Sequence, residues 1–560
     1  MRIHTNLWLV AVFGAFIWLI PGSAELVGQE GIEARAFGPK SPPVETSNFG
    51  DLAEGPYNRL VIRNVMVIPG HGGPPTGPHD ILIEGNVITE MRSYDPVALE
   101  RARQAGEPID RLDGDRVIEG DGKYVMPGMF DLHYHVRTDP IPLEYSYYLK
   151  LAHGVTTTVT VPDGRFDQIW ADQQAAERYE VLAPRQHPFW NWGRGADATP
   201  EELQDPAEAP RIAREMIEAG GRAVGINGLT WNPELFEAAA RAVTEAGGVT
   251  TVHLPPSNMA QMHAVDAARM GVTFIKHHYG LAESALPRRV QDFPRDYGYN
   301  NEQQRFRAAA TVWEEVGWHP ENRQRLLNDV ADSLVHYGVK MLPTMVVYEA
   351  SRDILRAQSL PWHDKYTHRA LLEWSVPDPH WHGAFHWDWT HDDEESWRYA
   401  FDLWGDLIYE FNKRGGVVAM GTDDNYIWAT AGFSNIRELQ LVRESGMHSL
   451  EVLASATYNS AQALLEPNLG LVREGYLADL ILVDGNPAEN FRHMYSFGAI
   501  RMGEMGEMRR SQGIVHTIKD GVVIENSRLM EEVARMVDEY RPESTDPLIT
   551  EEPFRLPGPG

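Results

Sequence analysis

The chain contains no cysteine among its 560 residues. This absence excludes disulfide bonds, thiol nucleophiles and zinc sites built on thiolates. Any metal ion would have to be held by histidine, aspartate, glutamate or a modified lysine.

Basic residues are scarce as well. The 50 Lys and Arg stand against 80 Asp and Glu, which gives a formal net charge of -30 at pH 7. A chain of that sign repels phosphate backbones and anionic lipid surfaces, so we expect no nucleic-acid partner. The hydrophobic fraction of 43% is ordinary for a globular protein and excludes disorder along the whole chain.

The N-terminal segment combines one early arginine with an apolar run over residues 7–20. The sequence "PGSA" follows, with Gly22 and Ala24 as small residues before a cleavage point. This order is typical of a secretory signal, and the run is shorter than the roughly 20 residues of a membrane span. We expect residues 1–24 to be a signal peptide and the protein to be exported, periplasmic or extracellular, without stable membrane insertion. An uncleaved anchor is the alternative.

Alternating apolar and polar residues occur in two distant parts of the chain. Residues 59–70 and 79–91 alternate around a Gly/Pro turn, and "GYLADLILVDGNP" and "IVHTIKDGVVIEN" alternate near the C-terminus. Such alternation predicts half-buried strands joined by tight turns. Because the centre of the chain has another character, we predict one small β-sandwich built from both ends, over residues 58–126 and 466–530.

The centre, residues 127–465, repeats one pattern. A helical stretch ends with glycine and an apolar strand follows, as in "KLAHGVTTTVTV", "VTEAGGVTTVHL" and "NKRGGVVAMGTDD". Helices that alternate with buried strands indicate a parallel sheet. With "FDLHYHV", "RAVGIN" and "RYEVLAP" the strands number about eight, which favours an α/β fold of the (β/α)8 TIM barrel type over an open sheet. Residues 25–57 then form a linker, and residues 531–560 a C-terminal helix and tail.

Histidine and aspartate residues stand at the C-terminal ends of the predicted barrel strands, which converge at one mouth. Several imidazoles and one carboxylate suit a divalent cation, zinc first, that activates water for hydrolysis. The candidate residues are His133, His135, His253, one of the strand-six histidines His277 and His278, and Asp423.

These motifs resemble the amidohydrolase superfamily, closest to its imidazolonepropionase-like and prolidase-like branch. The resemblance spans residues 58–530 and rests on "PGMFDLHYH", "HGVTTTVTVPDG", "GTDD" and the tail "LEVLASATYNSAQALLEPNLGLVREGYLADLILVDGNP". It implies a metal-bearing (β/α)8 barrel with a β-sandwich from both chain ends. It also implies that His133, His135 and His253 are metal ligands, and that Asp423 is both a ligand and the catalytic base.

The predicted strands six and four each leave a site residue open. The family motif I-E-H-G aligns with "IKHH" and selects His277 as a catalytic or metal residue, whereas period-two counting selects His278. Many family members carry a carboxylated lysine on strand four that bridges two metals, but Asn227 stands near that place here. We therefore expect one zinc ion, with two as the alternative, and a His277 that hydrogen-bonds substrate or water. Lys276 precedes His277 directly, so we expect its side chain to point away from the site.

Two insertions follow predicted strands, over residues 281–328 and 348–398. In a barrel they would overhang the mouth, and we predict a lid in the second. A self-packed loop, an oligomer contact or a separate metal site are the alternatives. The tryptophans that either contact substrate or bury themselves under these loops are Trp190, Trp192, Trp381 and Trp387.

The combined prediction is a metal-dependent hydrolase that cleaves an amide-type C–N bond in a cyclic amide or a short peptide. An ester, a lactone or an amidine is the alternative substrate, because the fold does not select the bond. Deaminase-like branches usually have a glutamate three residues after the strand-five histidine, where this chain has Pro256. A non-catalytic binding protein on the same scaffold is the third possibility. The sequence leaves a homo-oligomer open.

Overall fold

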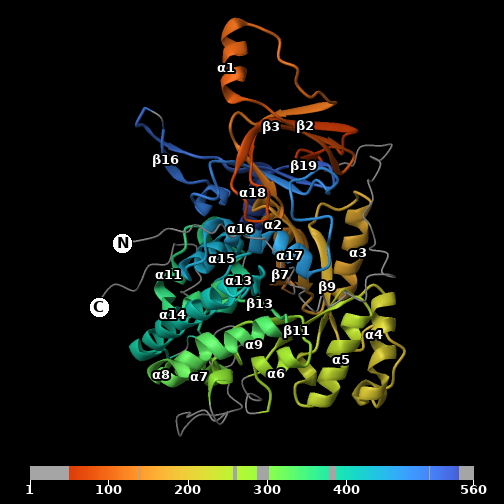
Figure 1. The fold of residues 1–560 in the computed structure, drawn as a ribbon, viewed down its shortest axis with the longest axis vertical. Coiled ribbons are helices and arrows are strands. Elements are labelled where there is room, and N and C mark those ends of the chain that lie inside the picture. Colours follow the sequence, from red (N-terminus) through yellow and green to blue (C-terminus); the bar gives the residue numbers. More distant parts are fainter. Residues whose placement is uncertain are drawn as a thin grey trace, which may run out of the picture. The chain divides into compact units, whose positions relative to one another are not determined.

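The computed structural model describes residues 49–540 except 138, 256–260, 287–301, 378–385, 387 and 504. One parallel sheet has the strand order β14-β13-β12-β11-β10-β9-β8-β7, so that neighbours in the sheet are neighbours in the chain (Figure 1). Its strands are β7 (Met129–His135), β8 (Val155–Val161), β9 (Arg185–Asn191), β10 (Ala223–Gly225), β11 (Val249–His253), β12 (Phe274–Lys276), β13 (Lys340–Leu342) and β14 (Val417–Val418).

Backbone hydrogen bonds join the first and last strands of this sheet. The N–H of Leu132 on β7 donates to the carbonyl of Met420, just past β14, at 2.8 Å, and the N–H of Thr422 donates to the carbonyl of His133 at 3.1 Å. Eight parallel strands that close in this way form a barrel. The predicted α/β barrel is confirmed.

One predicted strand lies elsewhere. Residues 178–184, "RYEVLAP", do not form a strand, because Tyr179 has a left-handed φ of 61° and the N–H of Glu180 caps helix α3 at the carbonyl of Ala175. The third strand, β9, begins directly afterwards at Arg185. Strand β9 was not predicted because it begins with a charged residue and so lacks the apolar pattern of the other strands.

Helices follow the barrel strands and cover the sheet. They are α2 (Leu143–Ala152), α3 (Phe166–Glu177), α4 (Ala209–Glu218), α5 (Pro233–Glu245), α6 (Ala264–Arg269), α7 (Glu302–Trp318), α8 (Pro320–Arg325), α9 (Ala331–His336), α10 (Met345–Arg352), α11 (Ile354–Gln358), α12 (His363–Tyr366), α13 (Arg369–Ser375), α14 (His391–Lys413), α15 (Phe433–Glu444), α16 (Ser449–Ala456) and α17 (Tyr458–Ala463).

Both predicted insertions contain helices where the structure describes them, namely α7 and α8 in the first, and α11 to α13 with the start of α14 in the second. Residues 378–385 and 387, the core of the predicted lid, lie outside the described residues. Trp381 and Trp387 are among them, so the lid stays a prediction. Trp190 is 4% exposed and packs edge-on against Trp170, and Nε1 of Trp192 donates to the carbonyl of Leu203 at 3.1 Å. These two tryptophans therefore serve local packing.

The second sheet takes strands from both ends of the chain, as predicted. Strand β15 pairs antiparallel with β6 on one side and with β18 on the other. The strands are β1 (Ala53–Glu54), β2 (Arg59–Val67), β3 (Thr76–Glu84), β4 (Val87–Ser93), β5 (Arg116–Glu119), β6 (Tyr124–Pro127), β15 (Leu480–Asp484), β18 (Gly513–Lys519) and β19 (Val522–Glu525). The domain boundaries given above stay predictions.

A buried arginine ties this sheet to the barrel. Arg185 of β9 donates to Asp479 at 2.5 Å and to Asp520 at 3.0 Å, and its side chain is 2% exposed. A buried guanidinium held by two carboxylates is tolerated because both charges are matched and hydrogen-bonded.

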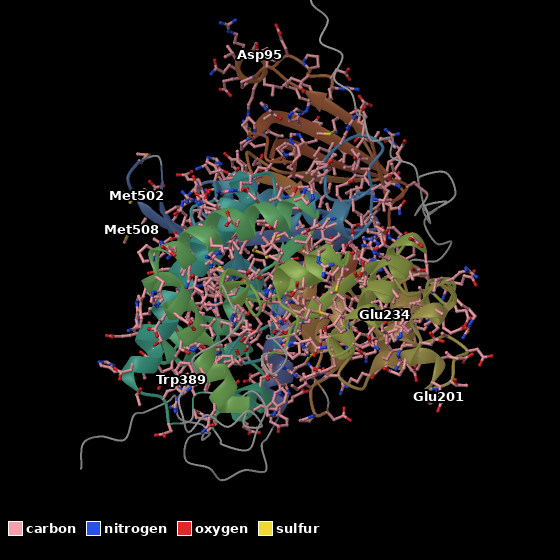
Figure 2. All side chains as sticks on the ribbon, turned by 60° about the horizontal axis from the view of Figure 1, so that its bottom comes forward. Asp95, Glu201, Glu234, Trp389, Met502 and Met508 are labelled. Atoms are coloured by element: carbon pink, nitrogen blue, oxygen red, sulfur yellow. The ribbon has the colours of Figure 1, made fainter. Side chains whose placement is uncertain are left out.

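Three further elements complete the described chain. Helix α1 (Pro96–Ala105) is capped by the Asp95 side chain, and helix α18 (Asn526–Glu539) follows β19 (Figure 2). The hairpin of β16 (Ile500–Met502) and β17 (Met508–Arg510) exposes Met502 and Met508. No helix in the described ranges is long and apolar enough to cross a membrane. Residues 1–24 lie outside those ranges, and export stays a prediction.

Candidate metal centre

Three side chains from the first and last strands of the barrel meet at one point. His133 and His135 lie on β7, and Asp423 follows β14. The Nε2 atoms of both histidines lie 3.1 Å from Oδ1 of Asp423. Within the described ranges, these residues form the group whose ligand atoms all lie within 4.8 Å of one another. The structure thus brings together three of the predicted ligands.

The backbone at the end of β7 holds Asp423 in place. Its N–H donates to the carbonyl of His133 at 2.7 Å. Asp423 has a φ of 54°, in the left-handed region where aspartate and asparagine are enriched among non-glycine residues. A short polar side chain therefore suits the turn that brings this carboxylate back toward the histidines.

The two strand-six histidines have different surroundings. Nε2 of His277 lies 3.5 Å from Oδ2 of Asp423, and its Nδ1 lies 2.5 Å from the hydroxyl of Thr344. His278 packs among buried aromatic rings, where Nε1 of Trp313 donates to its Nδ1 at 3.4 Å. Of the two alternatives, the structure places His277 beside Asp423.

His253 ends β11 next to His277, with 4.8 Å between the ring centroids. It is not one of the three residues whose ligand atoms gather around Asp423. Its backbone N–H donates to Oδ1 of Asn227 at 2.8 Å, so the residue near the strand-four lysine position serves the backbone of β11. The ligand role of His253 stays a prediction.

Lys276 does not point away from the site, and that expectation is wrong. Its Nζ lies 3.2 Å from Nδ1 of His133 and 4.7 Å from the ring centroid of Phe189, and the residue is 2% exposed. Strand β12 ends at Lys276, so the alternation of faces does not extend to His277. The centre of the barrel therefore contains a lysine, supplied by strand six and not by strand four.

Burial largely determines the protonation states of Asp423 and of the residues around it. It lowers the pKa of His133 to about 4, helped by the charge of Lys276, and it lowers the pKa of His277 well below its usual value. It also lowers the pKa of Lys276 to about 7. Burial alone would raise the pKa of Asp423, but His277 and His133 outweigh it and hold that pKa well below its usual range. Near neutral pH, an ionised carboxylate therefore faces neutral imidazoles at His133 and His277.

Asp163 orients His135 and was not singled out as a site residue from the sequence. Both of its carboxylate oxygens lie 3.0 Å from Nδ1 of His135, and Arg137 donates to one of them at 3.1 Å. Burial would lower the pKa of His135, but the hydrogen bonds to Asp163 and Asp423 outweigh it and raise that pKa. A proton on Nδ1 leaves Nε2 free to bind a cation. The available signal was position, since Asp163 lies two residues after the end of β8 in "VPDG".

Replacing Asp163 by alanine is expected to weaken binding of a divalent cation about 10- to 100-fold, because His135 loses the partner that fixes its ring. Competition with a chromophoric chelator measures this affinity. Asp139→Ala, at an exposed aspartate four residues after the end of β7, is the control and should bind as the wild type does. Equal affinity in both variants would show that Asp163 does not orient the ligand.

The residues present fit a divalent cation. Two ligands that each lie about 2 Å from one ion are roughly 3 to 3.5 Å apart, and the histidine nitrogens here lie 3.1 Å from the carboxylate oxygen. Imidazole nitrogens with a carboxylate oxygen are the donors that zinc and similar ions prefer. His133, His135 and Asp423 would hold the ion, and His277 borders them. Zinc itself and the number of ions stay predictions.

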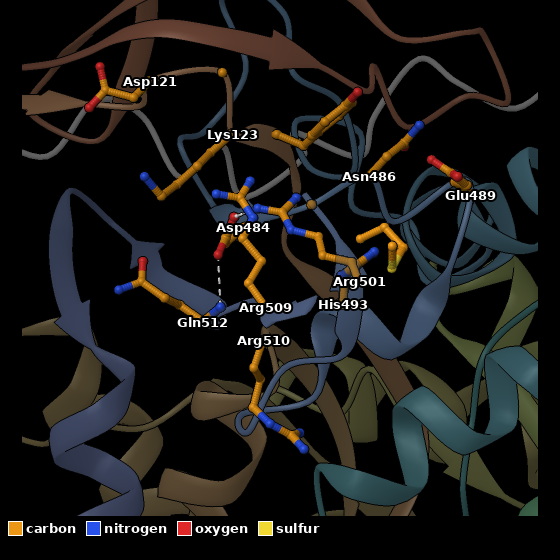
Figure 3. Close-up of a pocket in the computed structure, with 14 residues that line it drawn as sticks. Asp121, Lys123, Asp484, Asn486, Glu489, His493, Arg501, Arg509, Arg510 and Gln512 are labelled. Atoms are coloured by element: carbon orange, nitrogen blue, oxygen red, sulfur yellow. Dashed lines mark hydrogen bonds and ion pairs between the residues drawn. The ribbon is translucent and has the colours of Figure 1, made fainter. Parts of the chain in front are cut away.

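A separate pocket of about 690 Å³ contains none of these residues (Figure 3). Within it, Arg501 and the N–H of Gln512 both donate to Asp484, at 2.7 and 2.8 Å. Its polar groups bind one another, and we assign it no catalytic role.

Comparison with known sequences gives short or distant matches. A sequence model described as "Amidohydrolase family" matches residues 406–524, a range that includes Asp423. An adenine deaminase of Clostridium perfringens is 46% identical over 54 residues, which is 10% of this chain and 9% of that protein. A 5-methylthioadenosine/S-adenosylhomocysteine deaminase of Symbiobacterium thermophilum is 27% identical over 201 residues, 35% of this chain and 42% of that protein. The chain thus matches less than half the length of these relatives.

Solved structures share the fold over most of the chain. A Xaa-Pro dipeptidase with bound methionine has a TM-score of 0.52 at 18% identity, and the match covers 83% of this chain and all of that one. A bottromycin amidohydrolase has a TM-score of 0.54 at 17% identity, with 86% of this chain and 91% of that one covered. At these identities the likeness concerns the fold alone.

Proposed function

We propose that this chain belongs to the amidohydrolase superfamily and is a metal-dependent hydrolase of an amide-type C–N bond. The main observation that supports this proposal is that His133, His135 and His277 converge on the carboxylate of Asp423. A buried carboxylate among imidazoles at the C-terminal ends of barrel strands is placed where active sites of this fold form. The proposed reaction has two parts, the binding of the cation and the transfer of a proton.

His133, His135 and Asp423 would bind the cation, which when present supplies acidification of a water molecule and polarisation of a carbonyl. Asp423 stays ionised at neutral pH and can accept the proton of the attacking water. His277, fixed by the hydroxyl of Thr344 at its Nδ1, has its Nε2 directed at Oδ2 of Asp423. From there a neutral His277 can hydrogen-bond the substrate oxygen, while Asp423 can pass the proton that it accepted from water to the leaving group.

A short peptide or a cyclic amide is the substrate class that we propose first. The likeness of the fold to a Xaa-Pro dipeptidase makes a dipeptide ending in proline a reasonable first compound. Release of an amine together with a carboxylate identifies this reaction.

Deamination of an amidine-type substrate is the second candidate. It is favoured by the deaminases among the sequence relatives. Against it stands Pro256, three residues after His253, where deaminase-like branches usually have a glutamate. Release of ammonia, measured in parallel with amine release, separates the two reactions.

Protein purified without added metal is expected to contain about one zinc ion per chain, because Asn227 carries no charge with which to bridge a second ion. Elemental analysis measures the content, and His133→Ala/His135→Ala should lose it. About two ions per chain would contradict the single-ion proposal and would direct attention to Lys276 as a bridging residue. No metal, even after reconstitution, would favour a binding protein on this scaffold.

A further inference from the structure

Five arginines line a pocket of about 440 Å³ that contains none of the residues of the metal centre. They come from α10, α11, α14, α15 and the short helix η7 (Phe491–Met494). They are Arg352, Arg356, Arg398, Arg437 and Arg492. The chain as a whole carries 80 acidic and 50 basic residues, so this concentration of positive charge runs against its general character.

Two of the arginines form a fixed floor. Nε of Arg437 donates to both carboxylate oxygens of Glu349, at 3.0 and 2.9 Å, and its Nη1 lies 3.1 Å from Glu444. Arg352 binds the other oxygen of Glu444 at 2.9 Å. The side chains of Arg437 and Glu349 are 8% and 7% exposed. Ion pairs therefore hold the floor in place, and the pair between Arg437 and Glu349 is buried.

The other three arginines form a more open rim. Arg356 binds Glu349, the carboxylate that Arg437 also uses, and Arg398 pairs with Glu394 at 2.8 Å. Arg492 is exposed, and its side chain makes no ion pair or hydrogen bond within the described part of the chain. Each of the three can direct further N–H groups into the pocket.

The nearby carboxylates are already engaged. Glu349 pairs with three of the arginines and Glu444 with two, and Asp353 accepts the backbone N–H of Arg356 at 3.0 Å. Burial lowers the pKa of Arg356, and the positive charges of neighbouring arginines act in the same direction. Repulsion between the guanidinium groups is therefore only partly compensated, and an anion in the pocket would relieve it.

We propose that this pocket binds a small molecule through a phosphoryl group. Guanidinium forks match pairs of phosphate oxygens, and several forks that face one volume select a tetrahedral oxyanion over a single carboxylate. A volume of 440 Å³ exceeds one phosphate ion and lies within the range of small-molecule sites, so free phosphate and an organic phosphate are the two sources. The shared chemistry is the phosphoryl group.

The pocket is distinct from the metal centre. Helix α10 begins at Met345, next to the Thr344 that contacts His277, whereas Arg352 is its last residue. Seven residues of helix separate these ends by about 10 Å. Binding at one end can therefore be tested without disturbing the ligands at the other.

Isothermal titration calorimetry with inorganic phosphate, at constant ionic strength maintained with chloride, tests the proposal on the full chain. We expect one phosphate per chain, and at least about 10-fold weaker binding in Arg356→Gln/Arg492→Gln. Arg178→Gln, which removes an exposed arginine paired with Glu180 elsewhere, should bind as the wild type does. No binding by the wild type, or equal binding by the double variant, would overturn the proposal.

Three further titrations complete the experiment. The titration is repeated on chelator-treated protein, because phosphate can also bind a metal ion, and retained binding that still depends on the arginines supports the pocket. Arg492→Gln alone changes an exposed side chain that has no partner among the described residues, so it reports on binding even where the double variant fails to fold. AMP is the organic probe: tighter binding than phosphate assigns an organic phosphate, and equal or weaker binding assigns the free ion.

Discussion

Replacing Asp423 by asparagine is expected to lower kcat/KM by a factor on the order of 10³ while leaving the fold intact. The amide cannot accept the proton of the attacking water, and it lacks the charge that faces His133, His135 and His277. Asparagine tolerates the left-handed φ of 54° at this position almost as well as aspartate does. The loss is therefore chemical and does not follow from a distorted turn.

The measurement combines amine release from a panel of proline-containing dipeptides and cyclic amides with elemental analysis and circular dichroism. Asp121→Asn is the matched control, since Asp121 also has a left-handed φ, 47°, but lies in an exposed turn. Loss of activity with full metal content identifies Asp423 as the base, and loss of both identifies it as a needed ligand. Wild-type activity in Asp423→Asn would remove it from the mechanism.

Replacing Lys150 by methionine is expected to lower the free energy of unfolding by about 3–5 kcal/mol. Nζ of Lys150 lies 2.6 Å from both Asp131 and Asp424, and 2.9 Å from the side-chain oxygen of Asn435, with none of the lysine exposed. Without the ammonium group, two buried carboxylates face each other unpaired. Because Asp424 directly follows Asp423, the same group also supports the turn that contains Asp423.

The pH dependence of this loss has a defined sign. Burial raises the pKa of Asp424 to about 6 from 3.8, so the native state holds a proton more tightly than the unfolded chain. Its contribution to the unfolding free energy falls as pH rises from 3.8 through about 6. In Lys150→Met the opposing charge is gone, the pKa rises further, and the fall extends to higher pH. The variant should therefore lose more stability at pH 8 than at pH 5.

Chemical denaturation at these two pH values measures the effect. Lys340→Met, on barrel strand β13, is the control, because Nζ of Lys340 donates to the carbonyl of Gly338 at 3.0 Å and not to a carboxylate. Lys150→Met/Asp424→Asn should recover part of the loss by removing one unpaired charge. A loss below about 1 kcal/mol, the size of an exposed ion pair, would contradict the assigned role.

The parts of the site that could be predicted from the sequence are those fixed by strand periodicity. His133 and His135 are two residues apart on one strand, so they share a face in any strand that contains both. Asp423 could be placed because "GTDD" ends the last barrel strand. The barrel and the sheet built from both chain ends follow from the same local patterns, which depend on neighbours in sequence.

The orientation of Lys276 and His277 could not be predicted in this way, because alternation stops where the strand does. Lys276 is the last residue of β12, and the chain beyond it places His277 against the same group of histidines. Asp163 and Thr344 contact site histidines from loops, and the buried partners of Lys150 come from three separate segments. Such contacts depend on tertiary structure and have no local signature.

The pairing of β6 with β15 also governs when this protein can finish folding. Met126 pairs with Ile481, about 350 residues later in the chain. At ribosomal rates the second strand emerges roughly 20 to 70 s after the first. Until β15 has been synthesised, the edge of β6 that pairs with it is open. The entire barrel is synthesised during this interval. Completion of the sheet is thus a late step that depends on a long-range contact. If pairing with β15 is delayed, the unpaired edge of β6 is the surface through which chains would aggregate.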